Sequence, residues 1–143
     1  MSLSLSTPLP LRCGLVLPDR VALAPLTNTQ SHADGTLSEA ESRWLLRRAQ
    51  DGFGTVETCA TYVSEEGKAW VGQLGLATAA HEAAVAPLAK GLFRAQTEGI
   101  VQLHHAGDKA TCADVRRSTA DRPAEGVRGA TRADLGRVVD DYV

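Results

Sequence analysis

Two polar residues that could take part in chemistry stand at or near the ends of apolar runs of this chain. Thr27 follows the apolar run 21–26, and Gln102 lies within the run 100–104. A hydroxyl can donate or accept a hydrogen bond, and a carboxamide offers a donor beside an acceptor. Taken alone, Thr27 has the character of an ordinary turn residue, whereas Gln102 needs a hydrogen-bond partner if its strand is buried.

His104 and His105 invite a metal-binding interpretation, but adjacent side chains on a strand point to opposite faces. No carboxylate-rich cluster accompanies them in the sequence. The cysteines are odd in number and widely spaced, which indicates neither a disulfide framework nor a CxxC metal knuckle; they are Cys13, Cys59 and Cys112. The sequence therefore predicts no metal site.

The elements that would position these residues repeat one order: an apolar run, a polar loop and a helical segment. The run 21–26 is expected to be a strand that ends at Pro25, because proline has no N–H for the ladder. Ser38-x-x-Glu41 is typical of a capping box, and Asp51-Gly52 supplies a stop. Together these signals predict a helix, to which Trp44 contributes apolar surface.

The runs 54–60 and 100–104 begin the second and third repeats. The second helix is expected to hold Pro87 in its first turn, where a missing N–H costs nothing. Its inward residues would be Val85, Leu88, Ala89 and Leu92. Within the second run, Glu57 is expected to be a partnered structural carboxylate, and Trp70 is expected to anchor the loop that follows.

The third run leads into a loop, 107–129, in which arginines alternate with acidic residues. That mixture predicts a solvated surface of mixed charge. Thr131-x-x-Asp134 then begins a last helix, within which the sequence ends, and its inward residues would be Leu135, Val138, Val139 and Tyr142.

Alternating strands and helices indicate an α/β fold with parallel strands and right-handed crossovers. An open doubly wound sheet and a (β/α)8 barrel both fit this order. The first strand-to-helix loop lacks GxGxxG, which disfavours a dinucleotide site of the Rossmann type. A barrel takes roughly 200 residues or more, and three β/α units would leave it open at an edge.

Composition describes an ordinary globular protein, with 43% hydrophobic residues, 22% charged residues and a formal net charge of -2 over 143 residues. A weakly acidic balance gives no reason to expect nucleic acid or a membrane surface as partner. No stretch reaches the roughly 18 apolar residues of a membrane span. Residues 1–10 lack the pattern of a signal peptide, so a cytoplasmic location is expected.

Three motifs, in order along the chain, resemble the Old Yellow Enzyme family. Residues 18–27 are similar to its first barrel strand, with Asp19 in place of the usual Asn, and residues 47–58 are similar to its first helix and second strand. Gln102-Leu103-His104-His105-Ala106-Gly107 resembles its third-strand signature, Gln-Leu-x-His-x-Gly. The resemblance implies the N-terminal part of a TIM-type barrel: an arm or hairpin over 1–17, then the first three β/α units over 18–143.

The resemblance implies an FMN-dependent oxidoreductase of the ene-reductase type, with NAD(P)H as reductant and an activated alkene such as an enone as substrate. Pro25 and Leu26 would lie against the flavin through their backbone, and the Thr27 hydroxyl would tune its electronics. Ala60 would offer a backbone N–H, and the Gln102 carboxamide would meet the pyrimidine-like edge of the flavin. The family's proton-donating Tyr and its substrate-orienting pair would come after this sequence.

Two alternatives to this enzymatic interpretation stay open. A catalytically inactive barrel fragment could serve as an assembly or binding module, because exposed strand edges favour self-association or pairing with a complementary barrel segment. Another FMN- or phosphate-binding barrel, such as a dihydroorotate dehydrogenase relative, fits the α/β pattern too, although the motif from Gln102 to Gly107 argues against it. Asp108, where many Old Yellow Enzyme relatives carry Arg, is a departure from the family pattern.

Overall fold

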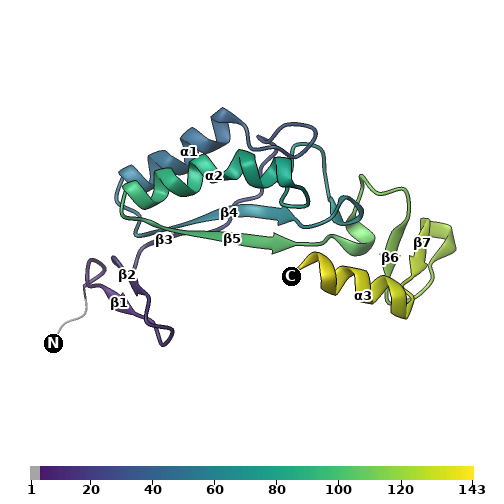
Figure 1. Ribbon diagram of the computed structural model, residues 1–143. Coiled ribbons are helices and arrows are strands. Elements are labelled where there is room, and N and C mark those ends of the chain that lie inside the picture. The colour runs from purple at the N-terminus through teal and green to yellow at the C-terminus, as the bar shows by residue number, and fades with distance from the viewer. Residues whose placement is uncertain (1–3) are drawn as a thin grey trace.

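The computed structural model describes residues 4–143 and is built around three parallel strands (Figure 1). They are β3 (Ala22–Leu23), β4 (Thr55–Tyr62) and β5 (Glu98–His104), in the order β3-β4-β5. Both strand pairs run parallel. The predicted α/β architecture with parallel strands is therefore confirmed.

Two helices, α1 (Glu39–Gln50) and α2 (Ala79–Arg94), lie side by side over one face of this sheet (Figure 1). The core lies between the two layers and consists of buried apolar side chains, namely Leu23, Leu45, Ala49, Val56, Leu88 and Leu92. Full burial of a leucine stabilises the fold by about 1.5–3 kcal/mol. Trp44 packs on the edge of this cluster.

Local signals explain where α1 begins and ends. The Ser38 side chain accepts a hydrogen bond from the Glu41 backbone N–H, and Gly52 adopts a φ of 99° just after the helix. Both predicted ends are confirmed. Only half of the expected capping box forms, however, because the Glu41 carboxylate is turned into the protein interior.

Two predicted boundaries were wrong. The first strand is only Ala22–Leu23, because the chain leaves the sheet before Pro25 and enters a loop. In the second helix, Thr78 caps the N-terminus through the His81 N–H, so Pro87 lies in the helix interior and not in the first turn. Leu88 and Leu92 face the core as predicted, whereas Val85 is half-buried and Ala89 is exposed.

The N-terminal segment contains a small antiparallel hairpin of β1 (Leu9–Pro10) and β2 (Val16–Leu17). In Figure 1 it lies near the end of the sheet where β3 and β5 begin. That is the end opposite to the carboxyl ends of the parallel strands. Residues 1–3 of the predicted N-terminal arm lie outside the described residues.

The segment 107–129, predicted as a loop, contains ordered elements. They are the 3-10 turns η2 (Gly107–Lys109) and η3 (Pro123–Glu125) and the strands β6 (Arg116–Ser118) and β7 (Val127–Gly129), which pair parallel. The helix α3 (Arg132–Asp141) follows, and Thr131 with Asp134 completes its predicted capping box.

The predicted inward face of α3 was wrong. Leu135, Val139 and Tyr142 are exposed, and Val138 is only half-buried. Leu135 and Val138 instead line a cavity with residues of the segment 105–119, so that segment does not pack closely against them. No helix among the described residues is long and apolar enough to cross a membrane.

Candidate functional site

The sequence-predicted site residues gather at the carboxyl ends of three neighbouring parallel strands. Pro25, Leu26 and Thr27 follow β3, while Ala60 and Gln102 lie towards the ends of β4 and β5. Ala60 and Gln102 are direct partners in the register of β4 and β5. The carboxyl ends of parallel strands are where α/β enzymes place their ligands.

Both apolar and polar groups are accessible at this end of the sheet. Leu26 is 51% exposed, and Thr27 beside it is also exposed. The side chains of Thr27 and Gln102 take part in no hydrogen bond within residues 4–143; Gln102 bonds there through its backbone N–H, which donates to the Thr58 Oγ1 at 3.3 Å. A free hydroxyl and a free carboxamide are therefore available to a ligand.

An irregularity in β4 shapes the position of Ala60. The register between β4 and β5 shifts between Glu57 and Ala60. Thr58 stabilises the shift, because its Oγ1 lies 2.9 Å from the Cys59 carbonyl and 3.0 Å from the Thr61 Oγ1. Irregularities of this kind bend a strand and redirect its residues, often next to functional sites.

Gln73, which sequence reasoning missed, holds the backbone of Ala60 in place. Its side chain is fully buried; Nε2 donates to the Ala60 carbonyl at 2.8 Å and Oε1 accepts from the Ala69 N–H at 2.7 Å. The only signal in the sequence is an amide side chain between Gly72 and Leu74, in a loop with several glycines.

The two histidines have separate surroundings. The His104 Nδ1 lies 3.3 Å from the Gln73 Nε2, and its ring centroid lies 6.3 Å from that of Trp70. Burial lowers the pKa of His104, with the charge of His105 adding to this effect. The His105 Nδ1 instead accepts from the Gly107 N–H. Among the described residues, no three His, Cys, Asp or Glu side chains are placed to hold a metal ion.

The loop after β3 is tied to its surroundings at Asn28. The Trp70 Nε1 donates to the Asn28 carbonyl at 2.8 Å, which confirms Trp70 as a loop anchor. The Asn28 Nδ2 donates to the Glu41 Oε1 at 3.0 Å. The segment carrying Thr27 is therefore fixed both to α1 and to the loop after β4.

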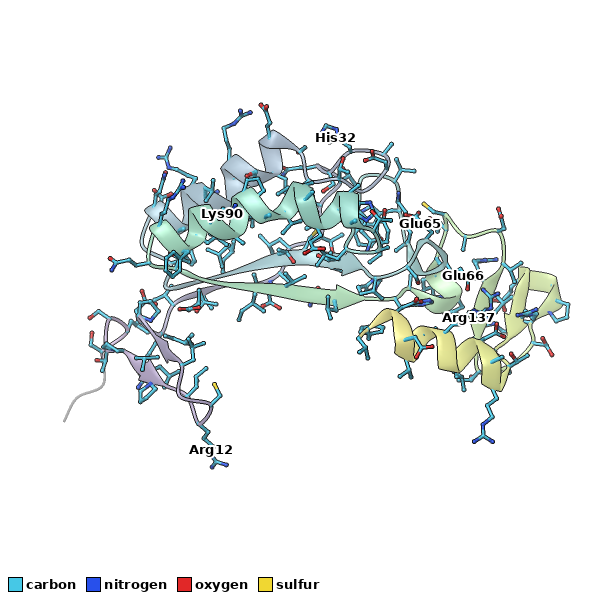
Figure 2. All side chains as sticks on the ribbon, in the orientation of Figure 1. Arg12, His32, Glu65, Glu66, Lys90 and Arg137 are labelled. Atoms are coloured by element: carbon cyan, nitrogen blue, oxygen red, sulfur yellow. The ribbon has the colours of Figure 1, made fainter. Side chains whose placement is uncertain are left out.

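The arginines of 107–129 were expected on a solvated surface, and Arg117 corrects this prediction. Its side chain is only 16% exposed and bridges Glu66, at 2.5 Å, to Asp134, at 3.1 Å. Asp134 is buried and also pairs with Arg128 and Arg137. Figure 2 shows Glu66, in the 3-10 turn η1 (Glu65–Gly67), on the side of the turn that approaches Arg137. Arg117 and Arg128 attach α3 to the rest of the chain through Asp134, whereas the pair of Arg137 with Asp134 lies within the helix.

Two other acidic residues refine the sequence-based expectations. Glu57 is half-buried, and its carboxylate makes no hydrogen bond or ion pair within residues 4–143, so the prediction of a partnered carboxylate was wrong. Asp108, at the family departure, pairs with Arg122, and the hydrogen bond from Arg122 lowers the pKa of Asp108. The Asp108 carboxylate is thus paired with a residue of the same segment, 107–129.

Comparison with known proteins places this arrangement among flavin enzymes. A family model described as the NADH:flavin oxidoreductase / NADH oxidase family matches residues 4–138. The probable NADH-dependent flavin oxidoreductase YqiG of Bacillus subtilis (strain 168) is 32% identical over 100 residues, which are 70% of this chain and 27% of that protein. The NADH:acrylate oxidoreductase of Vibrio harveyi is 28% identical over 97 residues, 68% of this chain and 10% of that protein.

Solved structures show the same fold. Morphinone reductase in complex with tetrahydroNAD superposes with a TM-score of 0.86 at 23% identity, over 99% of this chain and 44% of that chain. The Old Yellow Enzyme from Pichia sp. AKU4542 superposes with a TM-score of 0.87 at 16% identity, over 97% of this chain and 40% of that chain. This chain thus spans less than half the length of these two solved chains, and 27% and 10% of the two curated relatives.

The family match confirms the resemblance to Old Yellow Enzyme, and the family description itself names NADH and flavin, as the sequence motifs implied. The match extends over nearly all of the described chain and includes all three strand ends that carry the candidate site. The chain belongs to the NADH:flavin oxidoreductase / NADH oxidase family.

Proposed function

We propose that this chain provides the first three β/α units of a (β/α)8 barrel in an FMN-dependent oxidoreductase of the ene-reductase type. The whole enzyme would transfer hydride from NAD(P)H, through FMN, to a small-molecule activated alkene such as an enone. The observation that carries the proposal is the alignment of Ala60 and Gln102 at adjacent strand ends, with the Gln102 carboxamide free of protein partners.

The residues at these strand ends fit part of a flavin ring system. A free carboxamide can pair with the donor and acceptor atoms on the pyrimidine edge of a flavin. The exposed Leu26 side chain supplies apolar surface for one face of the ring, and the backbone around Pro25 would lie against the same face. The free Thr27 hydroxyl can donate a hydrogen bond at the ring edge. When bound, FMN supplies hydride acceptance and delivery, and these residues hold and orient it.

FMN binding to the purified chain tests the proposal through Gln102. We expect Gln102→Ala to weaken FMN binding about ten-fold, because hydrogen bonds to a ligand contribute about 1 kcal/mol or more. Titration with flavin fluorescence measures the dissociation constant. Gln50→Ala, in which an exposed glutamine at the end of α1 is removed, is the matched control and should leave the affinity unchanged. Equal affinities for the two variants, or no FMN uptake at all, would contradict the proposal.

A second candidate function is that of an assembly module, and the unpaired edge of β5 favours it. β3 and β5 are the outer strands of the three-stranded sheet, and Ile100 and Leu103 on β5 are each 44% exposed. Unpaired strand edges recruit other strands. The partner would be a second copy of the chain or a complementary barrel segment, and neither partner excludes flavin binding.

A further inference from the structure

One acidic side chain close to the candidate site is buried and has no role in the function proposed so far. Glu41, in the first turn of α1, is only 1% exposed, whereas Glu39 on the same helix is exposed. Removing a carboxylate from water is costly unless hydrogen-bond donors surround it. The contacts of Glu41 therefore carry information about why it is buried.

Three donors from separate places in the chain converge on this carboxylate. The Asn28 Nδ2 lies 3.0 Å from Oε1, and the Ser31 Oγ lies 2.5 Å from Oε2. The Cys59 Sγ lies 3.5 Å from Oε1. Burial, and then the charge of Glu41, raise the pKa of the Cys59 thiol to about 12, so the thiol is protonated and can donate.

The partners of Glu41 are the immediate neighbours of two candidate flavin-facing residues. Asn28 follows Thr27, and Cys59 precedes Ala60. Backbone pairing cannot hold these two strand ends together, since the ladder between β3 and β4 stops at the pair Leu23 and Val56. Beyond that pair, the Glu41 carboxylate joins the segment after β3 to β4 through the side chains of Asn28 and Cys59. A second link lies farther along the segment, where the Tyr62 hydroxyl donates to the Asp34 carbonyl.

We infer that Glu41 is a positioning residue, which sets the Thr27 segment against Ala60 so that both can contact one flavin. The inference rests on the proposed function for its ligand, but the link itself is a property of the chain without flavin. Glu41 does not touch the flavin; it acts through Asn28 and Cys59. Trp70 assists by holding the Asn28 carbonyl from the other side.

Hydrogen exchange of the flavin-free chain tests the link, with Glu41→Met as the disrupting variant. Methionine keeps the length of the side chain and removes both acceptor oxygens. We expect amide exchange to rise about ten-fold or more in residues 25–31 and 58–61, because each donor loses a buried partner. Glu41→Gln should restore most of the protection, since its carboxamide can accept from Asn28 and donate to Ser31.

Leu45→Val is the matched control, because it removes one methylene from the core face of the same helix without touching the carboxylate. Leu45→Val should not raise amide exchange in residues 25–31 and 58–61 more than it does in the rest of the chain. Unchanged exchange in Glu41→Met, or a rise shared equally with Leu45→Val, would overturn the inference. If Glu41→Met does not fold, Asn28→Ala removes a single donor and should raise exchange in residues 25–31 alone.

FMN titration of the same variants separates the inference from the proposed function. Glu41→Met should weaken FMN binding about ten-fold, and Glu41→Gln should retain affinity close to that of the unchanged chain. If Glu41→Met raises exchange as expected but the unchanged chain takes up no FMN, the link between the strand ends stands and the proposed flavin function is refuted. A chain that binds FMN equally well with and without the carboxylate refutes the positioning role.

Discussion

At the scale of single residues, Gln73 shows how a side chain can shape a binding surface from beneath. Its carboxamide has no access to solvent, and both of its ends bind the backbone. The Ala60 carbonyl on one side and the Ala69 N–H on the other are held in fixed directions. The Ala60 carbonyl belongs to the peptide unit between Ala60 and Thr61, so Gln73 fixes the backbone immediately after the N–H that we propose to meet the flavin.

Replacing Gln73 with methionine tests this dependence. The change preserves side-chain length but leaves the Ala60 carbonyl and the Ala69 N–H without these partners. We expect the free energy of unfolding to fall by about 2 kcal/mol, because each buried polar group that loses its partner costs about 1–3 kcal/mol. Urea denaturation measures it. Gln50→Met, at an exposed position of α1, is the control, and a loss below about 0.5 kcal/mol, typical of surface changes, would contradict the prediction.

At the scale of elements, α3 is attached mainly through the buried carboxylate of Asp134. Hydrogen bonds from Thr131, and then the arginines Arg137 and Arg128, hold the pKa of Asp134 well below its usual value of 3.8. A carboxyl group whose folded pKa is lowered stabilises the fold fully above its unfolded pKa. That stabilisation is lost as the pH falls from about 4 towards the lower folded pKa.

We therefore expect the attachment of α3 to weaken below about pH 4. Hydrogen exchange of residues 131–141 at pH 6 and pH 3, corrected for intrinsic rates, measures the protection of the helix. Asp134→Asn should lower this protection at pH 6 and remove much of its pH dependence. Asp141→Asn, at the exposed end of the same helix, should leave both unchanged. Identical pH profiles for the native chain and Asp134→Asn would contradict the prediction.

Elements were predictable from the sequence wherever local chemistry decides them. Ser38 and Thr131 start helices as expected because a cap needs only its own next turn. Glu41 defeated the same reasoning, since its partners Ser31 and Asn28 lie 10 and 13 residues away and are supplied by the fold. The spacing of residues in the sequence does not predict contacts between distant positions. The ion pair between Arg117 and Glu66 is a second contact of this kind.

The same distinction between local and long-range contacts applies to the candidate site. The positions of Thr27 and Gln102 follow from strand ends that apolar runs and a family-like motif mark in the sequence. The residues that hold the site in shape do not, because Gln73 binds Ala60 at a separation of 13 residues in the sequence. Short-range pattern therefore indicates where a ligand would bind, and long-range packing decides how firmly that surface is held.

At the scale of the whole molecule, α1 and α2 cover one face of the sheet, and β5 presents an uncovered edge (Figure 1). Its free backbone groups form an edge with which another strand can pair, and the Ile100 and Leu103 side chains are exposed on either side of it. Apolar residues of α3, including Leu135 and Val139, are exposed as well. A partner strand at this edge of β5 would therefore gain apolar burial in addition to backbone pairing.

Self-association through β5 is the prediction that follows for the isolated chain. We expect the mean mass in sedimentation to rise with concentration, because pairing would satisfy the strand edge and bury Ile100. Ile100→Lys should shift the species towards monomer, since pairing would have to bury a charge close to its own copy. Val71→Lys places the same charge at an exposed loop position and should leave association unchanged. A chain that stays monomeric at all concentrations would instead mean that twist or side chains of β5 already protect this edge, as natural sheets often arrange.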